Sequence, residues 1–155
     1  MNSKLIIVGG VVIVVLIVLQ FFSPKLLESE YATVAQFEKE TQVTGEVRNL
    51  LQTKCYDCHG GATEYPWYAK VAPVSFWIGH HIEEGQEHFD IMKWDNYSVK
   101  KKDHKLDELI EEVEENEMPL ESYNWLHGGL TDSEKNTLIS WAKNVRKEFV
   151  VEESK

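Results

Sequence analysis

The sequence predicts an all-α protein, with one helical domain preceded by a single N-terminal transmembrane helix. Apolar residues recur at helical spacing in several segments, and no stretch shows the strict alternation that is typical of a β-strand. A run of leucine, isoleucine, valine and glycine occupies residues 5–19, and Gln20, Phe21 and Phe22 extend it to residue 22. The 155 residues leave room for one domain beyond that run. We therefore expect a signal-anchor or transmembrane helix over residues 1–24, a linker over 25–43 and one domain over 44–150.

The apolar run is long enough to cross a membrane. Its 18 residues exceed the lower limit of about 17 for a spanning helix, although they also overlap the upper end of a signal-peptide core. No small-residue cleavage site follows, so we favour an uncleaved anchor over a cleaved signal. Lys4 favours a cytoplasmic amino end, although Lys25 on the other side weakens this signal. The expected location is the cytoplasmic (inner) membrane, single-pass, with the domain on the periplasmic side.

The remaining helices follow from periodicity. Polar, mixed residues over 25–43 suggest a linker, and a short helix is expected over about 44–57. Another helix begins near Trp77 and ends near Gly85 or Glu87. Two longer amphipathic helices cover about 104–116 and 132–148. The apolar positions behind these predictions are Val47, Leu50, Leu51, Leu106, Leu109, Ile110, Val113, Leu138, Ile139, Trp141, Ala142 and Val145.

Two boundaries carry further signals. Thr131 followed three residues later by Glu134 is typical of a capping box at a helix start. Pro119 ends the helix before it, because proline disfavours a helical residue at the preceding position. The basic run Lys100–Lys102 is interpreted as a solvated loop, with a docking patch as the less favoured alternative.

The motif Cys55-Tyr56-Asp57-Cys58-His59 is the most informative segment of the chain. C-x-x-C-H is the attachment sequence of a c-type haem, in which the two thiols bind the porphyrin and the histidine binds iron. The chain has two cysteines, and both lie in this motif. A structural zinc site would need four protein ligands, and no second C-x-x-C exists. A disulfide oxidoreductase would place the motif near a βαβ pattern, which the sequence does not show.

The order of these parts resembles a monohaem c-type cytochrome, in which the first and last helices pack together. The chain is closer still to a bacterial group known as haem-binding domain proteins. The resemblance runs over about residues 45–145. It rests on the attachment motif, Thr63, Tyr65-Pro66-Trp67-Tyr68, Ala72-Pro73-Val74-Ser75, His81, Gly85, Met118-Pro119, Tyr123 and Trp141. Gly60-Gly61 departs from the Ser-Asn that the group usually has there.

The resemblance implies a cytochrome c-like fold and one covalently attached haem c. His59 is the expected proximal iron ligand. A carbonyl at Pro73 could accept the other ring N–H of His59, as prolines after the motif do in cytochromes. The aromatic residues Tyr65, Trp67 and Tyr68, with Trp77 and Trp125, are candidates for the haem pocket.

The sixth ligand of the iron is left open by the sequence. Met118 is the leading candidate, because it precedes Pro119 at a helix end where a loop can direct its sulfur. Met/His ligation raises the reduction potential and suits electron transfer. Met92 has no such context and is expected to fill the core. The rival ligands are His80, His81 and His127, and an open site is the third possibility.

These residues favour a membrane-anchored electron carrier rather than an enzyme. No nucleophile elbow, phosphate loop or zinc-protease motif occurs. The alternatives are a haem-based sensor or peroxidase-like protein with an open distal site, and a haem subunit that docks on a larger respiratory complex. The net charge of −10 argues against nucleic acid as a partner, because phosphate binding needs Lys and Arg patches. The expected partners are redox proteins and the membrane.

Overall fold

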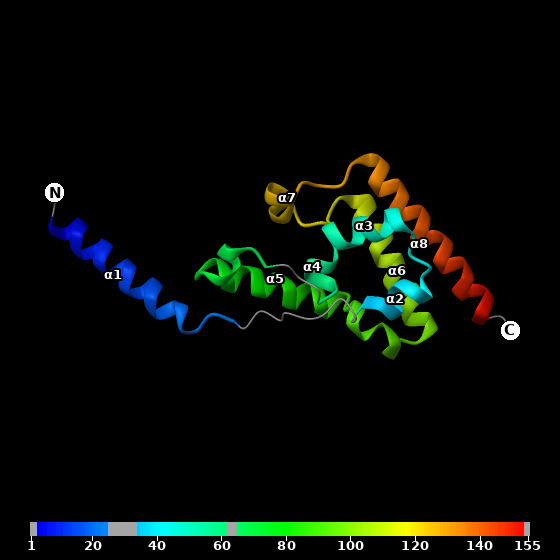
Figure 1. Ribbon diagram of the computed structural model, residues 1–155, viewed down its shortest axis with the longest axis horizontal. Coiled ribbons are helices and arrows are strands. Elements are labelled where there is room, and N and C mark those ends of the chain that lie inside the picture. The colour runs from blue at the N-terminus through cyan, green and yellow to red at the C-terminus, as the bar shows by residue number, and fades with distance from the viewer. Residues whose placement is uncertain (1–2, 25–33, 62–64, 154–155) are drawn as a thin grey trace.

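The computed structural model describes residues 3–24, 34–61 and 65–153 of the chain. Within these ranges every regular element is helical, which confirms the all-α prediction. Helix α1 projects from one end of the folded domain that the other elements build (Figure 1). The elements are α1 Ser3–Gln20, α2 Ala35–Glu40, α3 Gly45–Lys54, α4 Tyr56–His59, the 3-10 helix η2 Trp67–Lys70, α5 Val74–His88, the 3-10 helix η3 Ile91–Asn96, α6 Val99–Glu115, α7 Glu121–His127 and α8 Asp132–Glu153.

Helix α1 has the composition of a membrane span. It is 18 residues long, and none of its residues is buried against the rest of the protein. Its leucine, isoleucine and valine side chains are exposed on all sides, which is the pattern of a helix that is hydrophobic all round. By length and composition this helix can cross a bilayer.

The core lies where α6 and α8 pack along each other and α3 packs on α8 (Figure 1). Val47, Leu50 and Leu51 of α3 are buried in the same cluster as Leu138, Trp141 and Ala142 of α8, as the sequence predicted. The cluster is completed by Leu106 and Ile110 of α6. Each helix buries one apolar stripe, because residues three and four apart share a face.

The helix boundaries depend on local caps. Thr131 and Glu134 form the predicted capping box: the Thr131 N–H donates to Glu134 Oε2 at 2.7 Å, and the Glu134 N–H donates to Thr131 Oγ1 at 3.3 Å. Helix α6 begins at Val99, five residues before the predicted start, with Ser98 as its N-cap. The interpretation of Lys100–Lys102 as a loop is therefore wrong. Lys102 is buried and lies 2.6 Å from Glu40 Oε1.

The prediction of a linker over 25–43 is corrected at its carboxyl end, while residues 25–33 lie outside the described part of the chain. Val34 and Phe37 are 0% and 1% exposed, because α2 packs into the core. The Phe37 ring meets Trp94 of η3 edge-on at 4.9 Å and Trp141 of α8 at 6.0 Å. Buried Glu38 accepts from Arg48 Nε at 2.9 Å. The folded domain therefore includes residues 34–43.

Candidate functional site

The attachment motif lies at a break between two helices. Helix α3 ends at Lys54, and Cys55 has φ −126° and ψ −44°, which interrupts the helix that was predicted over 44–57. The short helix α4 carries the rest of the motif. Tyr56 is 1% exposed, and its hydroxyl donates to Glu38 Oε1 at 3.0 Å. This buried contact fixes the motif on the core through Tyr56 and leaves Asp57 and Cys58 to line a neighbouring cavity.

Both motif thiols are free and half-buried. Burial, with the Cys58 thiol and the Asp57 carboxylate as further causes, raises the pKa of Cys55 to about 12. Burial and Asp57 raise the pKa of Cys58 to about 11. A redox-active C-x-x-C pair needs a lowered pKa, because the thiolate is its nucleophile. The environment of these thiols is the opposite of that found in disulfide oxidoreductases.

His59 is held by the carboxyl end of α5. Its Nδ1 donates to the backbone carbonyl of Phe89 at 2.8 Å. Because a carbonyl only accepts, this bond places the proton on Nδ1 and leaves Nε2 as the nitrogen available to a metal. Burial lowers the pKa of His59, which favours the neutral ring that metal ligation needs.

The His59 N–H donates to the Phe89 carbonyl and not to that of Pro73, so the role expected for Pro73 is corrected. The Pro73 carbonyl lies at the start of α5, where it accepts from Phe76 and Trp77 N–H groups at 3.2 and 3.4 Å. It is therefore used within its own helix, whereas Phe89 at the other end of α5 serves His59.

Gly85 allows α4 to lie against α5. A Cβ at this position would stand 3.3 Å from Cys58 Cβ, which is tighter than ordinary van der Waals contact, and 3.4 Å from His59 Cε1. The absence of a side chain at Gly85 therefore lets the two motif residues approach the helix closely. His81 lies one turn earlier, so it shares the Gly85 face of α5.

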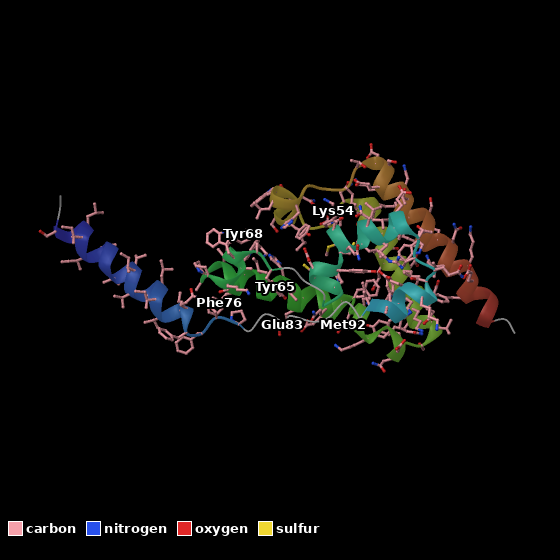
Figure 2. The ribbon with its side chains drawn as sticks, in the orientation of Figure 1. Lys54, Tyr65, Tyr68, Phe76, Glu83 and Met92 are labelled. Atoms are coloured by element: carbon pink, nitrogen blue, oxygen red, sulfur yellow. The ribbon has the colours of Figure 1, made fainter. Side chains whose placement is uncertain are left out.

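An apolar cavity of about 350 Å³ lies next to the motif, within the range of about 300–1,000 Å³ that is typical of ligand sites. Its walls come from α4, from η2 and the segment before it, from α5, and from α7 with its preceding loop. Tyr65 and Tyr68, labelled in Figure 2, contribute to the η2 side. The lining residues are Asp57, Cys58, Tyr65, Pro66, Tyr68, Val74, Trp77, Ile78, His81, Ile82, Leu120, Ser122, Tyr123, Leu126 and His127.

The cavity brings together some of the predicted site residues and leaves others outside. Cys58, Tyr65 and Tyr68 line it, as does Trp77. Trp67 does not: its side chain is 79% exposed and its ring meets the Tyr68 ring edge-on, so its expected place in the pocket is corrected. Trp125 is 74% exposed and is likewise outside.

Some of the candidate sixth ligands line the cavity and others do not. Met118 is half-buried and is not among the lining residues, although Leu120, two residues later, is. His81 and His127 both line the cavity. The exposed ring of His80 lies 3.4 Å from Glu84 instead. Helix α5 contributes His81 and α7 contributes His127.

Helix α7 closes one side of the cavity through polar contacts that the sequence did not reveal. The Tyr123 hydroxyl lies 2.8 Å from Asp57 Oδ2 and 3.0 Å from the Thr53 carbonyl. Burial, together with this carboxylate, raises the pKa of Tyr123 well above its usual value. The Tyr123 ring stacks on His127 at 4.2 Å. Lys54 Nζ donates to the carbonyls of His127 and Gly128, each at 2.7 Å. These contacts join α7 to the attachment motif.

A sequence model of the family described as Haem-binding domain matches residues 14–144 of the chain. This match covers most of the sequence, and the chain therefore belongs to that family of haem-binding proteins. No curated protein and no solved structure matches the chain.

The residues around the cavity fit a haem. The wall is apolar and rich in aromatic rings, as a flat hydrophobic ligand requires. Cys58 lines this wall, whereas Cys55 and His59 are not among the lining residues. The ring of His59, next to Cys58 in α4, is oriented by its bond to the Phe89 carbonyl. His59, Cys55 and Cys58 are the residues that would hold the group.

Proposed function

We propose that this chain is a membrane-anchored c-type cytochrome-like protein that binds one haem covalently and transfers single electrons. The observation that carries the proposal is the state of His59. The Nδ1–H of His59 donates to the Phe89 carbonyl. His59 directly follows Cys58, a free thiol that lines the apolar cavity. When bound, haem supplies reversible one-electron chemistry at its iron.

The residues of the chain would hold and tune that group. Cys55, between α3 and α4, and Cys58, in α4, would bind the group through their sulfurs, and His59 would bind its iron through Nε2. The hydrogen bond to Phe89 keeps the His59 ring in one tautomer and one orientation. The apolar wall excludes water, which raises the energetic effect of every nearby charge. Asp57, whose carboxylate lies in that wall, is the nearest such charge within the motif.

The anchoring part of the proposal rests on α1. The helix has the length and composition of a single span. We place its amino end in the cytoplasm and the haem domain on the periplasmic side of the inner membrane, where haem c attachment takes place. The domain would exchange electrons there with a redox protein and would itself catalyse no reaction.

Covalent attachment is tested on the full chain matured in a host that attaches haem c. The pigment is expected to stay with the protein in acid acetone. Cys55→Ala and Cys58→Ala should each leave one thioether and shift the haemochrome α-band, and the double variant should release all pigment. His59 is intact in these variants, so they separate attachment from iron ligation. Pigment that washes out of the parent protein would refute the c-type assignment.

We propose Met118 as the sixth ligand on the strength of its place in the sequence, before Pro119 and in the loop that leads to α7. Met118→Ala should abolish the weak band near about 695 nm of Met-ligated ferric haem and lower the midpoint potential. His127→Ala and His81→Ala are the matched variants, because both residues line the cavity. Loss of the low-spin spectrum in one of them, with Met118→Ala unchanged, would move the ligand to that histidine.

A sensor or peroxidase-like protein with an open distal site is the second candidate. It is favoured by the position of Met118 outside the set of cavity-lining residues. A carbon monoxide difference spectrum of the reduced protein separates the two candidates. No spectral change is expected for the electron carrier, whereas rapid formation of a carbon monoxide adduct would favour the open site.

A further inference from the structure

Helix α1 is barely long enough to span a bilayer. Its 18 residues rise about 27 Å at 1.5 Å per residue, against a hydrocarbon thickness of about 30 Å. A helix with no surplus length cannot extend far beyond the lipid. Gln20, at its carboxyl end, must therefore lie at the boundary between the hydrocarbon and the headgroups.

The haem domain is bound to that same end of α1. The Gln20 amide donates to the Lys70 carbonyl at 2.8 Å and accepts from the Ala72 N–H at 3.1 Å. The Ser23 hydroxyl lies 3.1 Å from the hydroxyl of the fully buried Ser75. Figure 1 shows that the end of the domain formed by η2 and the start of α5 is the one nearest to the carboxyl end of α1. The orientation of the domain against the span is thus set by direct contacts.

The domain also lies beside residues of α1 that precede its last turn. Val71 and Ala72 line one groove together with Ile13, Leu16 and Ile17 of α1. Leu16 and Ile17 precede Gln20 by four and three residues, which is about 4–6 Å along the helix axis. If Gln20 lies at the lipid boundary, the turn between η2 and α5 lies at or below that boundary as well.

The side chains around this turn are apolar and exposed, as a location at the membrane interface requires. We call the exposed apolar residues Trp67, Val71, Val74 and Trp77 the η2–α5 tip. Their exposed fractions are 79%, 42%, 37% and 47%. The neighbouring Phe21 and Phe22 are 85% and 71% exposed. Tryptophan is enriched at the membrane–water interface, where its apolar ring and polar N–H are both accommodated.

We propose that the η2–α5 tip inserts into the bilayer interface, so that this end of the haem domain is held in the membrane surface while α5 extends away from it. The partner is the lipid itself, and the argument rests on the continuity of the tip with α1. The inference therefore depends on the anchoring by α1 that was proposed above. The tip would contact the lipid through apolar side chains. Attraction to anionic headgroups would not contribute, because the chain as a whole carries a net charge of −10.

The position of the tip also places the haem cavity. Val74 and Trp77 belong to the tip and line the cavity at the same time. The side of the cavity that they form therefore faces the lipid headgroups. Only a reductant that works at the membrane surface would approach the haem from this side.

The test uses the full haem-loaded chain in phosphatidylcholine vesicles that contain a phospholipid with a diazirine in its acyl chain. After photolysis, lipid adducts are mapped on peptides by mass spectrometry. Adducts are expected on α1 and on the peptide 66–79, and not on α6 or α8. Val71→Glu and Trp67→Glu should each reduce labelling of 66–79 several-fold and leave labelling of α1 intact.

Trp125→Glu is the matched control, because Trp125 is similarly exposed but lies on α7, which is separated from α1 in Figure 1. It should leave the labelling of 66–79 unchanged. The Soret spectrum of each variant verifies that the domain is folded. Labelled α1 with unlabelled 66–79 would overturn the inference and leave the tip to a protein partner. Absence of adducts on α1 itself would refute the anchoring on which the inference rests.

Discussion

The two halves of the domain bury their apolar residues in different ways. In the core half, formed by α2, α3, η3, α6 and α8, the large side chains Phe37, Trp94 and Leu138 are each 1% exposed. In the cavity half, formed by η2, α5 and α7, Trp67, Trp77 and Leu126 are 79%, 47% and 68% exposed. Helix α7 buries no residue at all.

The difference shows which half of the domain fills its own interior with side chains. The core half is filled by its own side chains, with aromatic rings in edge-on contact. The cavity half surrounds a hollow of about 350 Å³, and hydrogen bonds of Tyr123 and Lys54 join its helix α7 to the rest of the domain. Apolar residues around a hollow gain little from packing until another molecule fills it. We therefore expect the cavity half to depend on haem for its stability and the core half to be independent of it.

Absence of haem should have the largest effect on stability, and this effect should be confined to the cavity half. In the chain produced without haem, amides of residues 65–82 and 118–129 should exchange with solvent many-fold faster than in the haem-loaded protein, because a ligand stabilises only the state that binds it. Amides of α6 and α8 should keep most of their protection. Hydrogen exchange read by mass spectrometry measures both halves at once. Equal loss of protection in both would contradict the proposed independence.

Phe37→Ala tests the core half. Truncation of a buried Phe leaves a cavity and should lower the free energy of unfolding by about 3–5 kcal/mol. Urea unfolding of the haem-loaded chain measures the change. Trp67→Ala is the control: at 79% exposure its truncation should stay within about 0.5 kcal/mol. A small effect of Phe37→Ala would mean that α2 is not an essential part of the core.

Tyr123→Phe tests the polar attachment of α7. The variant loses the hydroxyl that lies 2.8 Å from Asp57, and a hydrogen bond to a charged group contributes about 1.5–3 kcal/mol. We expect about 1–2 kcal/mol of lost protection at the amides of α7, because Tyr123 is only half-buried and Asp57 regains water. Helix α8 serves as the internal reference. Unchanged exchange in α7 would show that Lys54 alone holds this helix.

The smallest expected effect is the pH dependence of the α8 capping box. Hydrogen bonds from the Thr131 backbone and hydroxyl lower the pKa of Glu134 from its usual 4.5. A lowered folded-state pKa means that the carboxylate stabilises the protein above pH 4.5 and that this contribution disappears as pH falls further. Glu134→Gln should cost about 0.5 kcal/mol at pH 7. The cost should shrink as pH falls below 4.5 and through the lowered folded-state pKa of Glu134, as measured by urea unfolding.

The features that sequence could predict are those that depend on neighbours along the chain. Helix α1, the apolar stripes of α3, α6 and α8 and the capping box at Thr131 are all periodic or local patterns. The packing of Val47 and Leu50 on Leu138 was predicted from the resemblance of the chain to cytochromes. Helix α2 escaped prediction because its six residues are too few to show a period.

The parts of the site that escaped prediction join residues far apart in the sequence. The bond from His59 to the Phe89 carbonyl depends on where α5 ends, and any residue type can present a carbonyl. The family resemblance suggested Pro73 instead, which lies at the opposite end of the same helix. Tyr123 and Asp57 are separated by 66 residues, and no local pattern connects them.

Helix α5 joins the carboxyl end of α1 to His59. Near its start Ser75 contacts the exit of α1, and at its far end Gly85 and Phe89 contact His59. The ten residues from Ser75 to Gly85 span about 15 Å of rigid helix. If α1 spans the membrane and haem iron binds His59 as we propose, α5 would set the distance between the iron and the lipid. A reductant moving in the membrane plane would then always meet the iron at the same tunnelling distance.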